Sequence, residues 1–171
     1  MKPTLFFVTI LLFTGSACIA QESKKEAKAR QLEGAYQQVL ELLKSKQFEF
    51  VAQKALPMRG RQIDLTTRNN YLRVNGDKVE ADMPYFGRAY TGGYSTSDAG
   101  IKFNHTPEEY ELVTNDKKNR ALVKFRVKGD GDSYNCTLQL SSLGNASLSV
   151  ISNNKQGINY TGSVHELKED Q

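Results

Sequence analysis

Residues 121–150 read ALVKFRVKGDGDSYNCTLQLSSLGNASLSV, and this stretch decides the fold. Apolar Val123, Phe125 and Val127 alternate with polar Lys124 and Arg126. The same alternation resumes after turn residues 129–132 and again after a second turn at 141–145, with these apolar positions: Tyr134, Cys136, Leu138, Leu140, Ala146, Leu148 and Val150. Strict period-two alternation means that each strand buries one face and exposes the other, as in antiparallel sheets. We therefore predict three consecutive antiparallel strands here.

Shorter runs of the same kind lie on both sides of this stretch. The expected strands are Phe48–Leu56, Gln62–Leu65, Tyr71–Val74, Val79–Met83, Ile101–Phe103, Tyr110–Val113 and Ile158–Val164. Asn75-Gly76-Asp77 separates two of them and is a typical hairpin sequence. Roughly eight to ten short strands separated by turns predict a mainly β fold, either a small antiparallel β-barrel or a sandwich.

Residues 21–46 are predicted to form one amphipathic α-helix ahead of a single β domain at residues 47–166. This segment contains no proline and one glycine, Gly34. Its apolar stripe has helical spacing and consists of Leu32, Ala35, Tyr36, Val39, Leu42 and Leu43. We expect the second half to pack across an open end of the barrel, and the polar first turns to project into solvent. A partner helix or a membrane surface is the alternative contact for this stripe.

Residues 1–20 have the pattern of a cleavable signal peptide. Lys2 precedes an apolar run at Leu5–Phe13, and small residues follow as far as Ala20. This run is shorter than the about 20 residues that a membrane span needs, so no transmembrane span is expected. Cleavage after Ala20 is favoured. The alternative is a lipid anchor at Cys18, although Gly15 stands where a lipobox has a large aliphatic residue.

This leader predicts an exported protein, periplasmic or secreted, with an outer-membrane lipoprotein as the alternative. Of the 171 residues, the 151 that follow the leader are enough for one domain. The last five, residues 167–171, form a charged tail. The chain carries a net charge of +4, but its basic residues are interspersed with acidic ones, so no nucleic-acid partner is expected.

No catalytic or metal motif stands out, and neither an enzyme nor a cofactor is expected. Cys136 is the one cysteine after the leader, and its place in an alternating strand indicates a small core residue. His105, expected in a loop, and His165, expected near the frayed end of the chain, are far apart in sequence and are interpreted as surface residues. Asp130-Gly131-Asp132 lacks the further ligands of a calcium loop and is interpreted as a hairpin turn.

The segment from Met83 to Tyr94 is the most unusual in composition. It holds four aromatic residues, one arginine and three glycines. Aromatic side chains beside arginine are favoured at binding surfaces. The candidate ligand or partner patch is therefore Tyr85, Phe86, Arg88, Tyr90 and Tyr94. The alternative is that the aromatic side chains plug the barrel.

Several segments also resemble an uncharacterised family of exported Bacteroidota proteins, domain of unknown function 4251. The matching pieces are residues 50–55, 70–77, 84–90, 100–103, 144–150 and 158–162. Met83 stands where the family usually has leucine, a volume-conserving change. The resemblance implies a signal or lipoprotein leader, a helix and a compact barrel-like domain similar to lipocalins. It implies no activity.

The leading functional hypothesis is a non-enzymatic envelope binding module that holds a small apolar ligand in the barrel mouth. It requires an interior that the protein's own side chains leave open. The alternative is a structural or protein–protein interaction protein of the cell envelope, which would use the helix or the aromatic segment. A hydrolase is the least favoured class.

Overall fold

The structure is a computed structural model of the full chain, and it describes residues 15–68, 70–90, 100–129 and 131–167, with side chains from residue 24 onward. One helix, α1, spans Gly15–Ser45. Ten strands follow: β1 Gln47–Pro57, β2 Ile63–Asp64, β3 Tyr71–Asn75, β4 Lys78–Met83, β5 Ile101–His105, β6 Glu109–Asn115, β7 Arg120–Gly129, β8 Asp132–Ser141, β9 Asn145–Ser152 and β10 Ile158–Glu166. A 3₁₀ turn, η1, occupies Asp116–Lys118 between β6 and β7.

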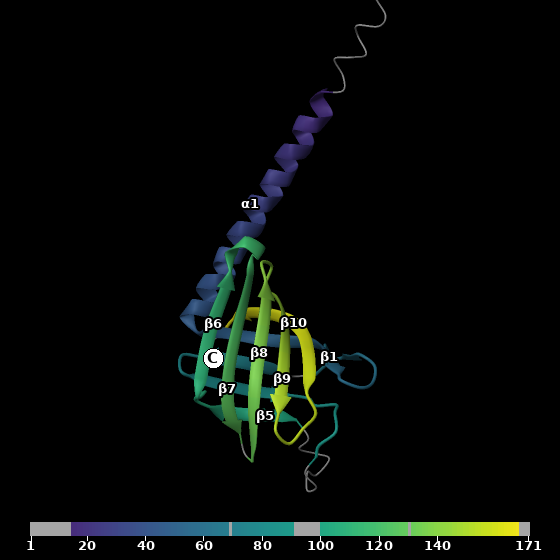
Figure 1. Ribbon diagram of the computed structural model, residues 1–171, viewed down its shortest axis with the longest axis vertical. Helices are drawn as coiled ribbons and strands as arrows, with labels where there is room; N and C mark the ends of the chain where they lie inside the picture. The colour runs from purple at the N-terminus through teal and green to yellow at the C-terminus, as the bar shows by residue number, and fades with distance from the viewer. Residues whose placement is uncertain (1–14, 69, 91–99, 130, 168–171) are drawn as a thin grey trace, which may run out of the picture.

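The strands form one antiparallel sheet that curls into a half-barrel (Figure 1). Its order is β5-β4-β3-β1-β10-β9-β8-β7-β6, and β2 pairs with β1 outside this path. The two ends of the sheet curl toward each other, so that the Phe103 ring of β5 lies 5.4 Å from the Tyr134 ring of β8. The predicted mainly β fold with one N-terminal helix is confirmed, and of its two forms the structure adopts an open barrel.

The core lies on the concave side of the sheet. Every residue that the alternation of 121–150 placed inside is buried: Val123, Phe125, Val127, Tyr134, Cys136, Leu138, Leu140, Ala146, Leu148 and Val150. The bulkiest fully buried side chains are Tyr36, Tyr160, Phe48 and Phe50. Together with the other buried hydrophobic residues they form one continuous cluster, so the interior is packed with the protein's own side chains.

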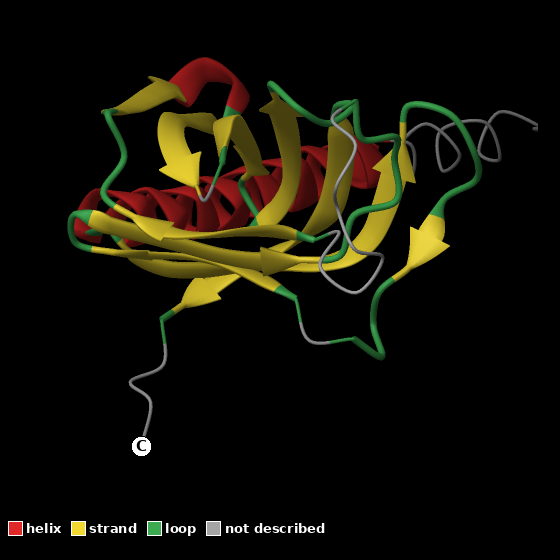
Figure 2. Cartoon of the chain, turned by 90° about the horizontal axis from the view of Figure 1, so that it is seen from below, coloured by secondary structure: helices red, strands yellow, loops and turns green. Residues whose placement is uncertain are grey.

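Helix α1 packs on the half-barrel with its C-terminal half and extends beyond it with its N-terminal half (Figures 1 and 2). Tyr36, Leu40 and Leu43 are buried, and Leu40 had no place in the predicted stripe. The Tyr36 hydroxyl lies 3.1 Å from Asp116 Oδ1 and 3.0 Å from the Arg120 carbonyl oxygen. Residues 24–31 are all exposed, which agrees with the prediction that the polar first turns of the helix project into solvent.

The helix begins at Gly15, six residues before the predicted cleavage point. Residues 1–14 lie outside the described part of the chain, so cleavage after Ala20 and lipidation at Cys18 both remain predictions. In the described residues, no helix combines the length and the apolar character that a membrane crossing requires.

A single residue, Lys46, joins the helix to β1. Its φ of 53° is left-handed, and its amide donates to the Leu43 carbonyl at 3.3 Å, which ends the helix. The Lys46 carbonyl accepts a hydrogen bond from Gly76 N at 2.8 Å, and its ammonium group lies 4.9 Å from the Tyr110 ring centroid. The joint is therefore fixed from both sides by the β3–β4 turn and by β6.

The histidines are on the surface, as predicted, but in strands. His105, expected in a loop, is the last residue of β5 and pairs with Val79. The pairing of β4 with β5 continues beyond Phe103, the last residue of the strand predicted from the apolar pattern. His165, expected near a frayed end, lies within β10 opposite Glu49. Residues 168–171 of the predicted tail lie outside the described residues.

Candidate functional site

The predicted aromatic patch divides into a half-buried and an exposed part. Tyr85 and Phe86 are half-buried and pack against the core cluster. Arg88 and Tyr90 are exposed, and the Tyr90 side chain is 68% exposed. Tyr94 lies outside the described residues. The structure thus brings two of the five predicted residues to the surface together.

Residues 84–90, here called the strap, run across one end of the half-barrel and pair with the β9–β10 loop. Ala89 bridges to Lys155, Gln156 N donates to the Arg88 carbonyl at 2.9 Å, and Tyr90 N donates to the Asn154 carbonyl at 2.8 Å. From the core, the Tyr160 hydroxyl donates to the Pro84 carbonyl at 2.8 Å. These backbone pairings hold the strap in one position.

Tyr85 anchors the strap by folding back over Gly87. Its hydroxyl lies 2.9 Å from the Arg88 carbonyl oxygen and 2.8 Å from that of Gln156. A Cβ on Gly87 would lie 2.1 Å from this hydroxyl, so any larger residue here would displace the Tyr85 ring from its hydrogen bonds. Burial raises the pKa of Tyr85. The contacts of Tyr85 are those of a structural plug, which was the alternative drawn from the sequence.

Two buried charged residues, Lys155 and Asp132, lie at this end of the half-barrel. Sequence reasoning had not singled out Lys155, and it had interpreted Asp132 only as part of the hairpin turn Asp130-Gly131-Asp132. Lys155 is buried, and its Nζ donates to the Gly100 carbonyl at 2.6 Å and lies 5.7 Å from the Tyr85 ring centroid. Asp132 is buried as well; its carboxylate accepts from Ser152 Oγ at 2.5 Å and from Ser133 N at 2.8 Å. Both side chains satisfy backbone or hydroxyl groups and shape the β9–β10 loop.

Exposed apolar side chains gather around the same loop. Of the five large hydrophobic side chains that are exposed among the described residues, Met58, Tyr90 and Ile151 are at this end of the molecule. A Cβ on Gly157 would lie 3.8 Å from Met58 Sδ and 4.0 Å from Ile151 Cγ1, so these two side chains flank one glycine. Exposed Arg59 and Arg88 adjoin them in sequence. We call these five residues the rim: Met58, Arg59, Arg88, Tyr90 and Ile151.

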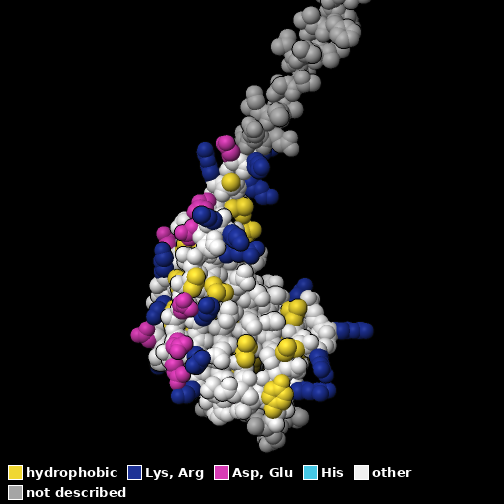
Figure 3. All heavy atoms as spheres, in the orientation of Figure 1, with side chains coloured by type: hydrophobic (Ala, Val, Ile, Leu, Met, Phe, Trp, Pro, Cys, Tyr) yellow, Lys and Arg dark blue, Asp and Glu magenta, His cyan; other side chains and the backbone are white. Residues whose placement is uncertain are grey.

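Figure 3 shows hydrophobic and basic side chains near one another on the lower right of the visible face. Neither rim arginine has a described carboxylate oxygen within 4 Å. The rim therefore combines apolar contact area with uncompensated positive charge.

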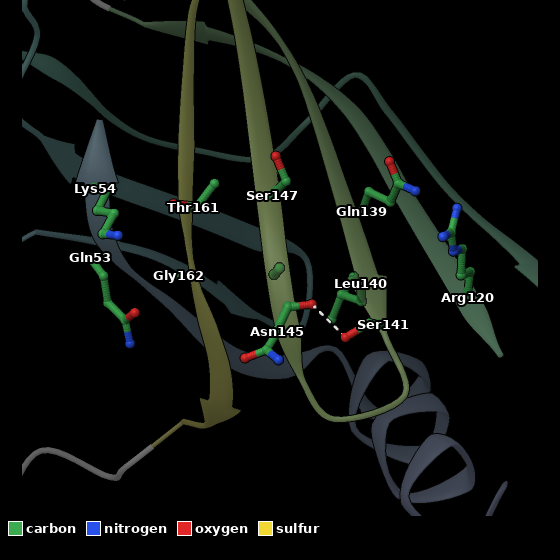
Figure 4. A pocket seen from close by; sticks show the side chains of 11 residues that line it. Gln53, Lys54, Arg120, Gln139, Leu140, Ser141, Asn145, Ser147, Thr161 and Gly162 are labelled. Atoms are coloured by element: carbon green, nitrogen blue, oxygen red, sulfur yellow. Dashed lines mark hydrogen bonds between the residues drawn. The ribbon is translucent and has the colours of Figure 1, made fainter. Parts of the chain in front are cut away.

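A second feature, here called the groove, is a hollow of about 500 Å³ on the solvated face of the sheet (Figure 4). Lys54 of β1, Thr161 of β10, Ser147 of β9 and Gln139 of β8 follow one another across it as register partners. Arg120 of β7 lies at the far side. The groove thus carries a row of polar side chains with one cation at each end.

A β-bulge shapes the end of the groove at β1. Ala52 pairs with Gly162 and Lys54 with Thr161, which leaves Gln53 as the extra residue. The bulge is held by Asn70, which is 5% exposed: its Oδ1 accepts from Ala52 N at 2.8 Å, and its Nδ2 donates to the Arg68 carbonyl at 2.9 Å. Sequence reasoning used Asn70 in the family resemblance alone, because the bulge that it supports is visible only in the paired strands.

The titratable groups do not form a metal or nucleophile cluster in the described part of the chain. No three His, Cys, Asp or Glu side chains there come together as metal ligands would. Cys136 is buried, as predicted, and burial raises the pKa of its thiol. His165 has Ser163 Oγ at 2.8 Å from its Nε2, on the exposed side of β10.

The comparisons with known proteins place this arrangement in a family. The family model described as "Domain of unknown function (DUF4251)" matches residues 30–164. The chain belongs to the DUF4251 family. Its predicted resemblance is thereby confirmed, and the strap, the bulge-holding Asn70 and the β9–β10 loop all lie within the matched residues.

The fold is similar to that of a solved structure. The solved structure is that of a DUF4251 family protein from Bacteroides eggerthii DSM 20697, 21% identical to this chain, with a TM-score of 0.59 over 77% of this chain and 87% of that one. At this identity the likeness extends to the fold alone. No curated protein matches the chain.

Proposed function

We propose that this DUF4251 protein is an exported, non-enzymatic interaction module of the cell envelope, and that it binds an acidic protein partner through the rim. Export rests on the leader pattern of residues 1–20. The choice of a protein partner rests on the geometry of the rim.

The observation that carries the proposal is the grouping of Met58, Tyr90 and Ile151, which are 70%, 68% and 58% exposed, around one loop. Tyrosine, methionine and arginine are the side chains in which protein interfaces are enriched. The strap that carries Tyr90 is fixed by backbone hydrogen bonds, so the rim is ordered before binding and little entropy is lost on contact. Arg59 and Arg88 have no described carboxylate within 4 Å, which favours an acidic partner surface.

Exposed side chains of this kind suit a protein better than a small molecule, because small-molecule sites are concave and bury most of the ligand. The interior that a small apolar ligand would occupy contains Phe48, Phe50, Leu138 and Tyr160, all fully buried. The open interior that the small-ligand hypothesis required is therefore filled by core side chains, and we do not propose that function.

The test of the proposal is site-specific photo-crosslinking in the cells that produce the protein. A crosslinking residue is placed at position 90 and, as the matched control, at Leu143, which is 63% exposed in the β8–β9 turn at the opposite end of β9. We expect position 90, and not position 143, to yield an adduct with one acidic protein, and Arg88→Glu to abolish it.

Binding of the purified partner then provides the quantitative test. Tyr90→Ala is expected to weaken it about 30-fold, which corresponds to about 2 kcal/mol for a central interface tyrosine. Equal crosslinking from both positions, or an affinity that Tyr90→Ala and Arg88→Glu leave unchanged, would refute the proposal.

A further inference from the structure

We propose that the groove is a second binding site, and that it takes an oligosaccharide carrying negatively charged groups. This proposal is independent of the rim. It rests on three properties of the groove: a cation without an ion pair among the described residues at each end, the neutral hydrogen-bonding side chains between them, and the buried support beneath the bulge that carries Lys54.

The first property is seen by comparing the outward cations of β7. Lys124 is opposite Glu111 of β6 and pairs with it at 3.5 Å, and Lys128 pairs with Glu108 at 2.6 Å. Arg120 instead has Asn115 on one side and Ser141 on the other, both neutral. No described carboxylate oxygen lies within 4 Å of the Arg120 guanidinium, so its charge is available to a ligand.

Lys54 supplies the corresponding charge at the other end. Its register partners are Thr161 and Asp64. The Asp64 carboxylate accepts hydrogen bonds from Thr66 N at 2.9 Å and Thr66 Oγ1 at 2.5 Å, and it is not within 4 Å of the Lys54 ammonium. The hydrogen bonds from Thr66 lower the pKa of Asp64, and Lys54 adds to this effect. Lys54 nevertheless forms no ion pair within 4 Å among the described residues and lines the groove as its second cation.

Between the two cations lie hydroxyl and amide side chains in register. Gln139, Ser147 and Thr161 follow one another on β8, β9 and β10. None of their side chains forms a hydrogen bond with another described residue. Arg120 and Lys54 are four strands apart, which is about 19 Å along the sheet at the usual strand spacing. This span fits a chain of linked sugars rather than a single ring.

The chemistry of the lining selects the ligand class. Hydroxyl and amide groups exchange hydrogen bonds with sugar hydroxyls, whereas a guanidinium and an ammonium prefer carboxylate, sulfate or phosphate. The polar row contains no aromatic side chain for a sugar ring to stack on, so binding relies on charge-assisted hydrogen bonds, which are about twice as strong as neutral ones. An acidic oligosaccharide satisfies both requirements, and a neutral one satisfies only the first.

The end of the groove at β1 is prearranged. Buried Asn70 holds the bulge, and the bulge sets where Gln53 and Lys54 project. Bulges are frequent next to binding sites because they re-aim a side chain.

The experiment is calorimetric titration of the purified protein with three probes of matched length: oligogalacturonate, a sulfated oligosaccharide and neutral dextran oligosaccharide. The first two distinguish carboxylate from sulfate as the anionic group. We expect at least one anionic probe to bind with an affinity that falls as salt increases, and the neutral probe to bind at least tenfold more weakly.

The variants are Lys54→Gln and Arg120→Gln, with Lys124→Gln as the matched control, because Lys124 is an outward β7 cation paired with Glu111. We expect each groove variant to weaken binding about tenfold, as for loss of one charge-assisted hydrogen bond. The control and Tyr90→Ala should leave the affinity unchanged, and unaltered thermal unfolding of each variant shows that it folds.

Four outcomes would overturn the proposal. These are no binding of either anionic probe, equal affinity for the neutral probe, equal loss in Lys124→Gln, and full affinity in the double variant of Lys54 and Arg120. None of them depends on the rim, so the groove and the proposed partner surface succeed or fail separately.

Discussion

Replacing Gly162 with alanine adds one methyl group where the two neighbouring strands β1 and β10 approach each other beside the bulge. An alanine Cβ at this position would lie 2.0 Å from the Val51 carbonyl oxygen and 2.9 Å from Ala52 Cα. Both are backbone atoms of the adjacent strand, so neither can rotate away as a side chain would. The strands must separate or the bulge must change its register.

The expected cost follows from the type of atom that is contacted. Overpacking of an interior typically costs about 1–3 kcal/mol. Because β10 is the middle strand of the nine-strand path and the contact is with backbone, we expect a loss at the upper end, about 3 kcal/mol. For a domain of this size that lowers Tm by about 6–12 °C.

Gly34→Ala is the matched control, because it makes the same chemical change at an exposed helix position with no atom within 4 Å. It should stabilise the protein by about 1 kcal/mol, the difference in helix propensity between glycine and alanine. Chemical denaturation of both variants at constant m-value measures the two changes. A Gly162→Ala variant within about 0.5 kcal/mol of the parent, the usual range for surface changes, would show that the β1–β10 approach does not require glycine.

Further predictions concern Asn70, Tyr110 and Cys136. Asn70→Ala removes the acceptor for the Ala52 amide, which should cost about 3 kcal/mol and speed exchange of that amide proton; normal exchange would contradict its role in the bulge. Tyr110→Phe removes a buried hydroxyl that has no partner among the described residues, so stability should rise by up to about 1 kcal/mol, and a fall of that size in denaturation would refute this. Burial raises the pKa of Tyr110 to about 12, above the value of about 10 for unfolded tyrosine. Its contribution to stability is therefore present below about pH 10 and is lost as pH rises towards 12, and pH titration of unfolding should show a smaller loss for Tyr110→Phe. The Cys136 thiol is buried with its pKa raised, so an alkylating reagent should react only as fast as the protein unfolds, and rapid labelling of the native protein would exclude its place in the core.

The local spacing of apolar residues in the sequence was sufficient to predict the strands and the helix. The alternation at 121–150 predicted both the hairpins and their buried faces, because a residue's face in an antiparallel strand depends on parity alone. The boundaries were less predictable: His105 continues a strand through pairing with Val79, and no apolar residue marks that end.

The site could not be predicted in the same way, since it depends on partners distant in sequence. Lys155 is buried because the Gly100 carbonyl, 55 residues away, accepts its hydrogen bond at 2.6 Å. The groove exists because Lys54 and Arg120 reach the same face through the register of four intervening strand pairs. For the aromatic segment, composition indicated an unusual role without distinguishing the half-buried Tyr85 from the exposed Tyr90.

Because only Lys46 connects helix α1 to β1, the helix has a fixed direction relative to the half-barrel and does not act as a flexible linker. Helix α1 leaves the half-barrel at the end where the β8–β9 turn lies, whereas the strap and the β9–β10 loop close the other end (Figure 1). Any attachment on the N-terminal side of α1 therefore fixes the direction in which the rim points, away from the attachment. Inserting two residues beside Lys46 would leave the rim chemically intact and remove this orientation.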